Sequence, residues 1–457
     1  MVPKTDPGAL AALREIESVL DTRWPESKID PTLDRVSALL DLLGDPQRAY
    51  PIVHITGTNG KTSTSRMTDA LLAGAGLRTG RFTSPHLQLV TERISVDGQP
   101  IDPARYVEVF RDVEPYLAMV DAGQPYPLSK FEVLTAMAFA AFADTPVDAA
   151  VIEVGLGGTW DSTNVADGRV AVVGPVGVDH EKFLGKDPVG IARDKAGIIK
   201  PGSIAVLAEQ SQPEIMAELL RRAGDVEATV ARQNEEFGVI DRRIAVGGQL
   251  LTLQGLGGVY DEIFLPLHGA HQASNAAVAL AAAEAFLGAG KENQLDVEAV
   301  RAAFAGVRTP GRLERVRNAP TVLLDAAHNP HGARALAAAL AEEFDFRKLI
   351  AVLGVMADKD VDGILGELEP VVNEVVLTAV DSPRAMPVDE LAAIAKGVFG
   401  EDRIVVETRL DDAIETAVGL AEDIGEPGQP LSGAGVLVTG SVVTVGAARA
   451  LFGKEPA

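Results

Sequence analysis

The stretch Pro51-Ile-Val-His-Ile-Thr-Gly57-Thr-Asn-Gly60-Lys61-Thr-Ser decides the fold. A short apolar run enters a glycine turn, and Gly-Lys-Thr then opens a segment of helical composition. In a phosphate-binding loop of this kind, backbone N–H groups and the helix N-terminus point at an anion. The lysine adds a positive charge for the outer phosphates, and the hydroxyl of Thr62 offers a further phosphate or metal contact. Only two residues separate Gly57 from Gly60, whereas a general P-loop has four.

Outward from this loop, short aliphatic runs alternate with segments rich in alanine, leucine and glutamate. The runs lack polar alternation, which is typical of parallel strands buried on both faces. We expect strands at residues 51–55, 149–154, 169–173 and 204–208, and helices at 62–75, 130–143, 187–196, 212–223 and 272–287. Residues 226–269 contain Gly-Gly turns and favour short antiparallel strands. The rhythm predicts an α/β fold with a mostly parallel, doubly wound sheet.

A second strand-and-helix series begins after Pro310-Gly311, a pair typical of a linker. Its expected strands are 321–324, 349–353, 374–378 and 436–439, and its expected helices are 333–343, 388–396 and 411–421. The sequence thus predicts a boundary near residue 308. It would separate an N-terminal P-loop domain (1–308) from a smaller Rossmann-like C-terminal domain (309–457).

The composition restricts the function. The 457 residues include 41 basic and 65 acidic side chains, a formal net charge of −24, which disfavours nucleic acid and anionic lipid as partners. The absence of cysteine excludes disulfides, thiolate metal sites and a cysteine nucleophile. The start lacks a signal-peptide pattern, and the apolar stretch at 134–143 is too short to span a bilayer. We therefore expect a cytoplasmic protein without membrane or nucleic-acid partners.

Polar side chains stand at the ends of several expected strands. Glu153 and His180 each end such a run, and Ser84 lies in Phe82-Thr-Ser-Pro-His. Open α/β sheets bind ligands at the carboxyl ends of their strands. A carboxylate, an imidazole and a hydroxyl there would form a partial shell for Mg²⁺, completed by water and phosphate.

Other candidates have a purely structural alternative. Lys195 near a helix end could complement the helix dipole, and Glu132 could be a first-turn acid. Asp325 and His328 follow a strand of the second series but could belong to a capped turn. Ser441, between the last strand and a helix, could present its hydroxyl to a bound anion. The recurrence of such residues in both domains favours a ligand between them.

A series of motifs in order resembles folylpolyglutamate synthases, and the bifunctional dihydrofolate synthase/folylpolyglutamate synthases of bacteria, within the Mur ligase superfamily. The resemblance covers about residues 20 to 452. The motifs are Gly57-Thr-Asn-Gly-Lys61, Thr83-Ser-Pro-His-Leu, Phe131-Glu-Val-Leu-Thr, Glu153-Val-Gly-Leu-Gly-Gly, Asp179-His180 with Leu184-Gly, Lys195-Ala-Gly-Ile, His271-Gln-Ala-Ser-Asn275-Ala, Gly311-Arg312-Leu-Glu, Asp325-Ala-Ala-His328-Asn-Pro and Thr439-Gly-Ser441.

The resemblance implies roles for individual residues. ATP would be bound by Gly57, Thr58, Asn59, Gly60, Lys61, Thr62, Asn275, Arg312 and Asp325. Two magnesium ions would have Ser84, Glu153 and His180 as ligands, and Lys195 would be N-carboxylated. Pteroate or folate would contact Asp30, Ser129, Phe131, Glu132, Asp161 and Ser162, and glutamate would contact His328 and Ser441. The residues implied in catalysis are Lys61, Lys195, Asp325 and His328.

The implied reaction is ATP-dependent amide formation by a monomer. ATP would phosphorylate a carboxylate of dihydropteroate or folate, and the amine of L-glutamate would displace phosphate. The alternatives are a Mur-type ligase for UDP-sugar peptides and a nucleotide-binding protein without synthetic activity. Lys130, Thr159 and Pro31-Thr32 depart from the family's usual pterin-side residues and bear on substrate preference, and Asp194 replaces the usual glutamate before the carboxylated lysine.

Overall fold

The strand that enters the P-loop, β1 (Ile52–Thr56), lies inside an eight-stranded sheet of the order β4-β3-β2-β5-β1-β6-β7-β8. The computed structural model describes residues 6–24, 30–290, 293–423 and 433–457. The other strands of this sheet are β2 (Thr79–Phe82), β3 (Ile94–Val96), β4 (Gln99–Pro100), β5 (Ala149–Glu153), β6 (Val170–Val173), β7 (Ile204–Leu207) and β8 (Thr229–Arg232). Neighbours pair in parallel from β2 to β8, whereas β3 and β4 pair antiparallel at one edge.

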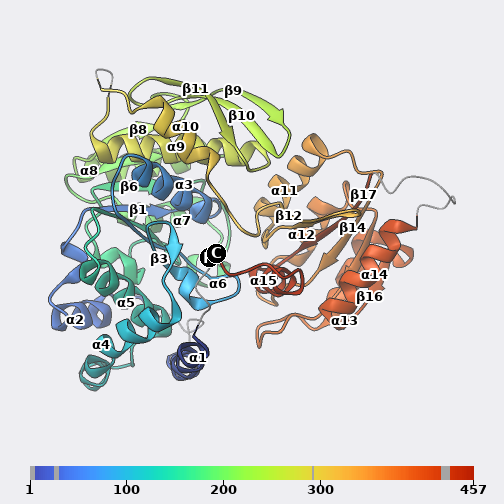
Figure 1. Ribbon diagram of the computed structural model, residues 1–457, viewed down its shortest axis with the longest axis horizontal. Helices are drawn as coiled ribbons and strands as arrows, with labels where there is room; N and C mark the ends of the chain where they lie inside the picture. Colours follow the sequence, from blue (N-terminus) through green and yellow to red (C-terminus); the bar gives the residue numbers. More distant parts are fainter. Residues whose placement is uncertain (1–5, 25–29, 291–292, 424–432) are drawn as a thin grey trace.

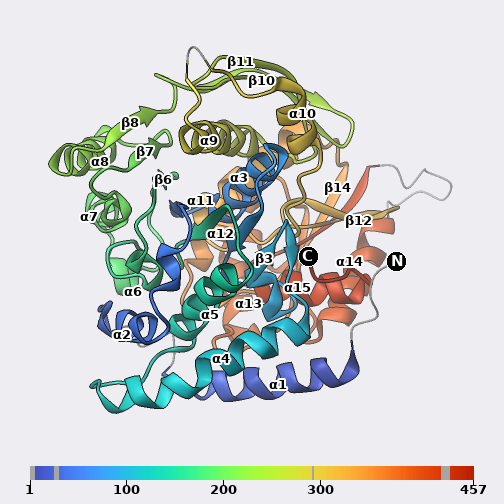
Figure 2. The same ribbon diagram turned by 60° about the vertical axis from the view of Figure 1, so that its left-hand side comes forward.

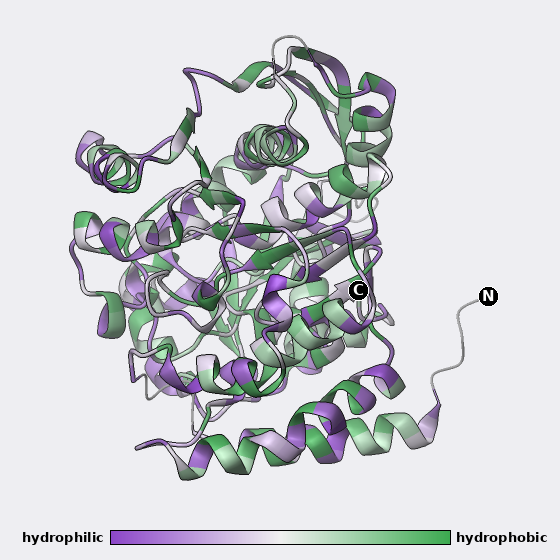
Figure 3. Ribbon diagram, turned by 90° about the vertical axis from the view of Figure 1, so that its left-hand side faces the viewer, coloured by the Kyte–Doolittle hydropathy of each residue, from purple (hydrophilic) through white to green (hydrophobic). Residues whose placement is uncertain are grey.

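Helices cover both faces of this sheet (Figures 1 and 2). On one face lie α3 (Lys61–Gly74), α9 (Ala270–Leu287) and α10 (Val297–Ala305). On the other lie α5 (Lys130–Asp144), α7 (Pro188–Lys195) and α8 (Pro213–Asp225), with α1 (Pro7–Asp21), α2 (Asp34–Leu42) and α4 (Pro103–Ala122) packed outside α5; the short α6 (Glu181–Leu184) precedes α7. Hydrophobic and hydrophilic residues alternate around the outer helices, as expected of helices that bury one face (Figure 3).

A small antiparallel sheet covers α9 from outside. It consists of β9 (Gly238–Ala245), β10 (Gly248–Gln254) and β11 (Val259–Leu265). This confirms the antiparallel excursion predicted for residues 226–269, except for β8, which instead extends the parallel sheet. As a short, half-exposed edge strand, β8 lacks the continuous apolar run that identified the central strands.

The C-terminal domain has a six-stranded sheet of the order β12-β13-β17-β14-β15-β16, parallel except for β12. Its strands are β12 (Glu314–Asn318), β13 (Thr321–Leu324), β14 (Lys348–Leu353), β15 (Glu374–Leu377), β16 (Ile404–Val406) and β17 (Ala434–Thr439). One face packs on α11 (Pro330–Glu343), α12 (Val361–Leu368) and α13 (Val388–Phe399), and the other on α14 (Leu410–Glu422) and α15 (Val442–Leu451). The predicted α/β class with two sheets is confirmed, although the sequence did not predict β12, β16 or α12.

The described parts of the chain contain no helix that is both long and apolar enough to cross a bilayer.

One buried acid holds the small sheet on α9. The Glu284 carboxylate in α9 is completely buried and accepts hydrogen bonds from the Leu256 and Gly257 amides, at 2.6 and 2.9 Å, and from the Tyr260 hydroxyl at 2.8 Å. Two of the three donors, the Gly257 amide and the Tyr260 hydroxyl, belong to buried residues.

We expect Glu284→Ala to lower the free energy of unfolding by about 2–4 kcal/mol, because it removes these bonds and leaves buried donors unpaired. Urea denaturation followed by circular dichroism measures the change. Glu415→Ala, at a solvent-exposed position of α14, is the matched control. Equal stability of the two variants would contradict this role of Glu284.

Candidate active site

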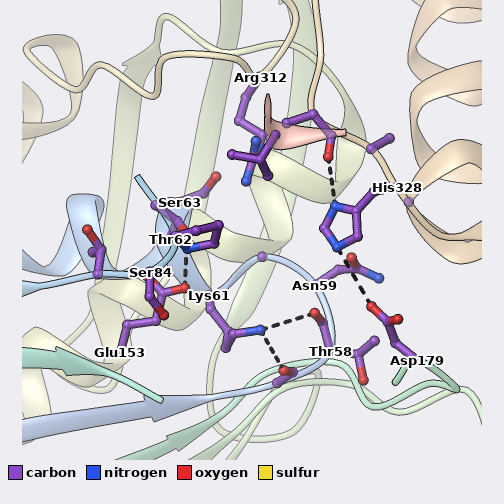
Figure 4. A pocket seen from close by; sticks show the side chains of 18 of the residues that line it. Thr58, Asn59, Lys61, Thr62, Ser63, Ser84, Glu153, Asp179, Arg312 and His328 are labelled. Atoms are coloured by element: carbon purple, nitrogen blue, oxygen red, sulfur yellow. Dashed lines mark hydrogen bonds and ion pairs between the residues drawn. The ribbon is translucent and has the colours of Figure 1, made fainter. Parts of the chain in front are cut away.

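A cavity of about 250 Å³ lies between the two domains, at the carboxyl ends of their parallel strands (Figure 4). The N-terminal domain contributes the P-loop, residues 83–87, residues 153–157, Asp179, His180 and Lys195. The C-terminal domain contributes Arg312, residues 325–328 and Val442. The structure thus brings the predicted phosphate and metal residues together with Asn275, Arg312, Asp325 and His328.

The P-loop requires a glycine at its turn into α3. Gly60 has φ +81°, and a Cβ atom there would lie 2.6 Å from the Asn275 side-chain oxygen. A side chain at this position would therefore meet both backbone strain and a steric conflict. Lys61 begins α3, and its ammonium group donates to the Gly57 and Thr58 carbonyl oxygens at 3.1 and 3.3 Å.

A second lysine reaches the same loop from α7. The Lys195 ammonium group donates to the Gly57 carbonyl oxygen at 3.0 Å, so the two lysines share one acceptor. Gly158 allows this approach, since a Cβ atom there would lie 2.7 Å from the Lys195 carbonyl oxygen. Burial lowers the pKa of Lys195 to about 7, with Lys61 acting in the same direction. Lys195 does end its helix as predicted. Its side chain, however, donates to the P-loop rather than to the carbonyl groups at the helix terminus.

Glu153 presents a carboxylate to this positively charged region. It ends β5, is 1% exposed, and one oxygen accepts from the Thr62 hydroxyl at 3.0 Å. The other oxygen, Oε2, has no hydrogen-bond partner among the described residues. Burial raises the pKa of Glu153 to about 7, although Lys61 opposes this shift. A buried carboxylate oxygen without a partner is suited to a bound cation.

The other predicted metal ligands, Ser84 and His180, also line the cavity. The described residues contain no cluster of three or more histidine, aspartate or glutamate side chains arranged for a metal ion. The predicted shell contains only one carboxylate and one imidazole, so it depends on the Ser84 hydroxyl, phosphate and water for its other ligands. Glu153 therefore fits Mg²⁺ best as one ligand beside a bound nucleotide.

Asp179 links the two domains, and the sequence analysis gave it no role. Its carboxylate accepts from Lys359 at 2.7 Å and from Asn329 at 2.9 Å, and lies 3.7 Å from the His328 ring. Burial alone would raise the pKa of Asp179, but Lys359 and His328 hold it below its ordinary value. The Asn329 amide also exchanges hydrogen bonds with the P-loop residue Asn59, at 3.2 and 3.3 Å. The signal available in the sequence was the position of Asp179 next to His180, in one of the motifs that carry the resemblance.

Backbone groups of the C-terminal domain orient the side chains of Asp325 and His328. Asp325 accepts from the amides of Leu313 and Ala327, both at 2.9 Å. His328 uses Nδ1 on the Ala326 carbonyl oxygen at 2.9 Å, so Nε2 faces the cavity side, and burial lowers its pKa to about 4. A neutral imidazole is therefore expected at pH 7.

Ser441 is buried and caps α15. Its hydroxyl oxygen accepts from the Thr444 amide at 3.0 Å and hydrogen-bonds with the Thr444 hydroxyl at 2.7 Å. Val442, not Ser441, is among the cavity-lining residues. The side chain thus acts on its own helix in this structure.

The predicted pteroate or folate residues lie together outside the cavity lining. Ser129 and Glu132 form a capping box on α5, and Glu132 also pairs with Arg35, which reaches Asp30 at 2.6 Å. The first-turn role considered for Glu132 is thereby confirmed. Phe131 and Asp161 lie next to Gly155 of the cavity lining, where they would meet an added Cβ atom, and Ser162 hydrogen-bonds with Thr135 at 2.8 Å.

Family models match both parts of the chain: a Mur ligase middle domain at residues 55–283 and the glutamate ligase domain of Mur ligases at residues 311–442. A dihydrofolate synthase/folylpolyglutamate synthase of Mycobacterium tuberculosis is 57% identical, with 98% of this chain and 96% of that protein covered. The chain belongs to the dihydrofolate synthase/folylpolyglutamate synthase family of Mur ligases. It is accordingly an ATP-dependent ligase that attaches glutamate in folate metabolism, as the resemblance predicted.

Solved structures agree with this assignment. A folylpolyglutamate synthase from Mycobacterium tuberculosis in complex with ADP superposes with a TM-score of 0.94 and 56% identity, covering 98% of this chain and 100% of that one. The Escherichia coli protein FolC in complex with DHPP and ADP superposes with a TM-score of 0.82 and 29% identity, covering 98% and 99%. These relatives favour the ligase over the two alternatives considered from the sequence.

Replacing Lys61 by alanine is expected to lower ATP-dependent turnover by about a hundredfold or more, because the outer phosphates lose a partly buried, pre-positioned cation. Phosphate release in the presence of both acceptor and glutamate measures this loss. Lys396→Ala removes an exposed lysine of α13 and should leave turnover unchanged. Near-normal turnover of Lys61→Ala would contradict the role of the P-loop.

Proposed function

We propose that this ligase activates a carboxylate of dihydropteroate or of a folate as an acyl phosphate, which the amine of L-glutamate then attacks. A free carboxylate is a poor electrophile, and phosphorylation provides a leaving group. The observation that supports this sequence is the single cavity that joins P-loop residues to Arg312, Asp325 and His328 of the other domain. All three reactants have to meet in such a cavity.

The nucleotide would lie along the P-loop with its phosphates on the amides of residues 57–62. Lys61 and Arg312 would offset the charge of the transferred phosphoryl group from opposite sides of the cavity, and Asn275 would contact the nucleotide from α9. Asp325 orients the backbone beside Arg312 through the Leu313 amide, which supports its assignment to the ATP side.

Glu153, Ser84 and His180 would hold magnesium beside the phosphates. The orphaned Glu153 oxygen and its raised pKa support this assignment. Magnesium, when bound, would neutralise phosphate charge during transfer. We assign two ions to the site, in keeping with the sequence prediction.

Acceptor and glutamate would enter from different sides. Asp30, Ser129, Phe131, Glu132, Asp161 and Ser162 would shape the pteroate or folate side, with Phe131 the member closest to the cavity wall. His328 would face the incoming glutamate, since its Nε2 points toward Asp179 and the seam between the domains. Ser441 would act there by placing the N-terminus of α15.

Closure of the C-terminal domain over the nucleotide would exclude water, which otherwise hydrolyses an acyl phosphate. The same proposal includes a domain boundary near residue 308, a monomeric state and a cytoplasmic location. Sedimentation of the purified protein tests the monomer.

The function is tested by mass analysis of the products formed from dihydropteroate and from tetrahydrofolate, each with ATP, Mg²⁺ and glutamate. We expect both acceptors to gain glutamate, and ATP consumption to require acceptor and glutamate together. A product from only one acceptor would restrict the proposal to that activity. ATP hydrolysis without any glutamylated product would overturn it.

The proposed N-carboxylation of Lys195 can be tested directly. Carbamate formation requires a neutral amine, whose fraction rises with pH through the folded-state pKa of about 7, whereas an ordinary lysine needs a pH near 10. Carbon-13 NMR with labelled bicarbonate should therefore show a carbamate that is stronger at pH 8 than at pH 6. The signal should vanish in Lys195→Ala and persist in Lys396→Ala.

Lys195→Ala should also lose most of its activity while retaining its fold, and acetate should restore part of it by occupying the vacant anionic position. An active Lys195→Ala enzyme, together with no carbamate signal in the native protein, would contradict N-carboxylation. Lys195 would then act only as an unmodified cation.

A further inference from the structure

A loop of the N-terminal domain reaches from the metal side of the active site to the C-terminal domain. We call residues Ser84–Leu89 the bridging loop; it follows β2 and precedes a short 3₁₀ helix, Val90–Arg93. Its first residues line the cavity. Glu153 lines the same cavity. The position of this loop therefore sets where Ser84 stands relative to Glu153.

Glu92 holds the bridging loop from the N-terminal side. Its buried carboxylate accepts three consecutive backbone amides, those of Leu87, Gln88 and Leu89, at 2.8–2.9 Å. Bonds from several amides to one ionised carboxylate are stronger than neutral ones. The loop is thus closed around a single side chain rather than by strand pairing.

Helix α15 engages the loop from the C-terminal side. Gly446 of α15 packs so tightly against the loop that an added Cβ atom would overlap the Leu87 carbonyl oxygen. The Gln88 side chain accepts a hydrogen bond from Arg449 of α15 and donates to the Lys454 carbonyl oxygen at 2.8 Å. The contact is specific, because it requires a residue without a side chain at Gly446 and an amide side chain at Gln88.

The network of contacts extends to Arg312, the residue of the C-terminal domain that we propose binds the nucleotide. Arg449 is 4% exposed and donates to Glu314 at 2.8 Å, and Glu314 in turn accepts from the Gly311 amide at 2.9 Å. Gly311 precedes Arg312. One chain of contacts therefore joins Ser84, by way of α15, to Arg312.

We propose that Glu92 and Gly446 are positioning residues, through which the docking of α15 on the bridging loop places Ser84 and Arg312 around the nucleotide. Neither residue is assigned to substrate or metal. This inference rests on the proposed roles of Ser84 and Arg312. It explains why α15 needs glycine at a helical position that faces the other domain.

The first test compares Gly446→Ala with Gly419→Ala. Gly419 lies in α14, where an added Cβ atom meets nothing within 4 Å, so the control makes the same change in the same domain without the contact. Hydrogen exchange of the protein without ligands reports on the loop directly. We expect residues 84–92 to exchange faster in Gly446→Ala only.

Kinetics separate positioning from loss of folded protein. Gly446→Ala should raise the KM for ATP about tenfold and lower kcat as well, because small misplacements of reacting groups are costly. Circular dichroism at the assay temperature should show the same folded fraction for Gly446→Ala and Gly419→Ala. Unchanged loop exchange together with an unchanged KM for ATP would overturn the proposal.

A second pair of variants tests the other side of the loop. Glu92→Gln replaces an acceptor by an amide that cannot serve all three N–H groups, and Glu114→Gln, on the exposed face of α4, is its control. Faster exchange of residues 87–89 and a raised KM are expected only for Glu92→Gln. Gln88→Ala should show the same KM defect, and Gln88→Glu, which keeps the acceptor for Arg449 but loses the donor to the Lys454 carbonyl oxygen, should restore the KM only in part.

Loop exchange needs no turnover, so its outcome is independent of which acceptor the enzyme uses. A failed product assay with altered exchange would count against the proposed function alone. Normal products with equal exchange in Gly446→Ala and Gly419→Ala would count against the bridging loop alone.

Discussion

The active site depends on two lysines, the partly buried Lys61 and the buried Lys195, that share one carbonyl oxygen. Lys61 and Lys195 both donate to the Gly57 backbone, one from the helix that follows the P-loop and one from α7. Two ammonium groups so close together are unfavourable unless an anion joins them. In a chain of net charge −24, this is a local reversal of sign that suits nucleotide phosphates. The lowered pKa of Lys195 and the raised pKa of Glu153 are both consequences of burial at this place.

The second constraint is the seam between the domains. The P-loop also contacts the C-terminal domain, because Asn59 exchanges hydrogen bonds with Asn329. Asp179 adds a buried ion pair with Lys359. Removing one partner of such a buried pair is costly, so the seam favours one relative arrangement of the domains. The residues proposed to bind the nucleotide from the two domains thereby line the same cavity.

The prediction of strands and helices succeeded where burial is uniform. Central strands such as β1 and β5 are buried at every position and appear as continuous apolar runs. The edge strand β8 has polar residues at both ends and β16 has only three residues, none of them fully buried, and the pairing of both depends on a neighbour that is distant in sequence. Glu132 and Ser441 illustrate a different limit. The resemblance implies ligand contacts for both, which remain predictions, but it gave no sign that their side chains also cap their own helices, where a hydroxyl or carboxylate has backbone amides within reach.

The sequence by itself determined the α/β class, the phosphate loop and the family, because each depends on short motifs whose local geometry is set by glycines, strand ends and helix starts. Only the tertiary structure decided that Lys195 meets Lys61 on Gly57, that Asp179 joins Lys359, and that Gly446 of α15 packs on Leu87. These contacts join residues separated by up to several hundred positions. Local periodicity carries no information about such pairs, since they form only when two independently folded sheets dock against each other.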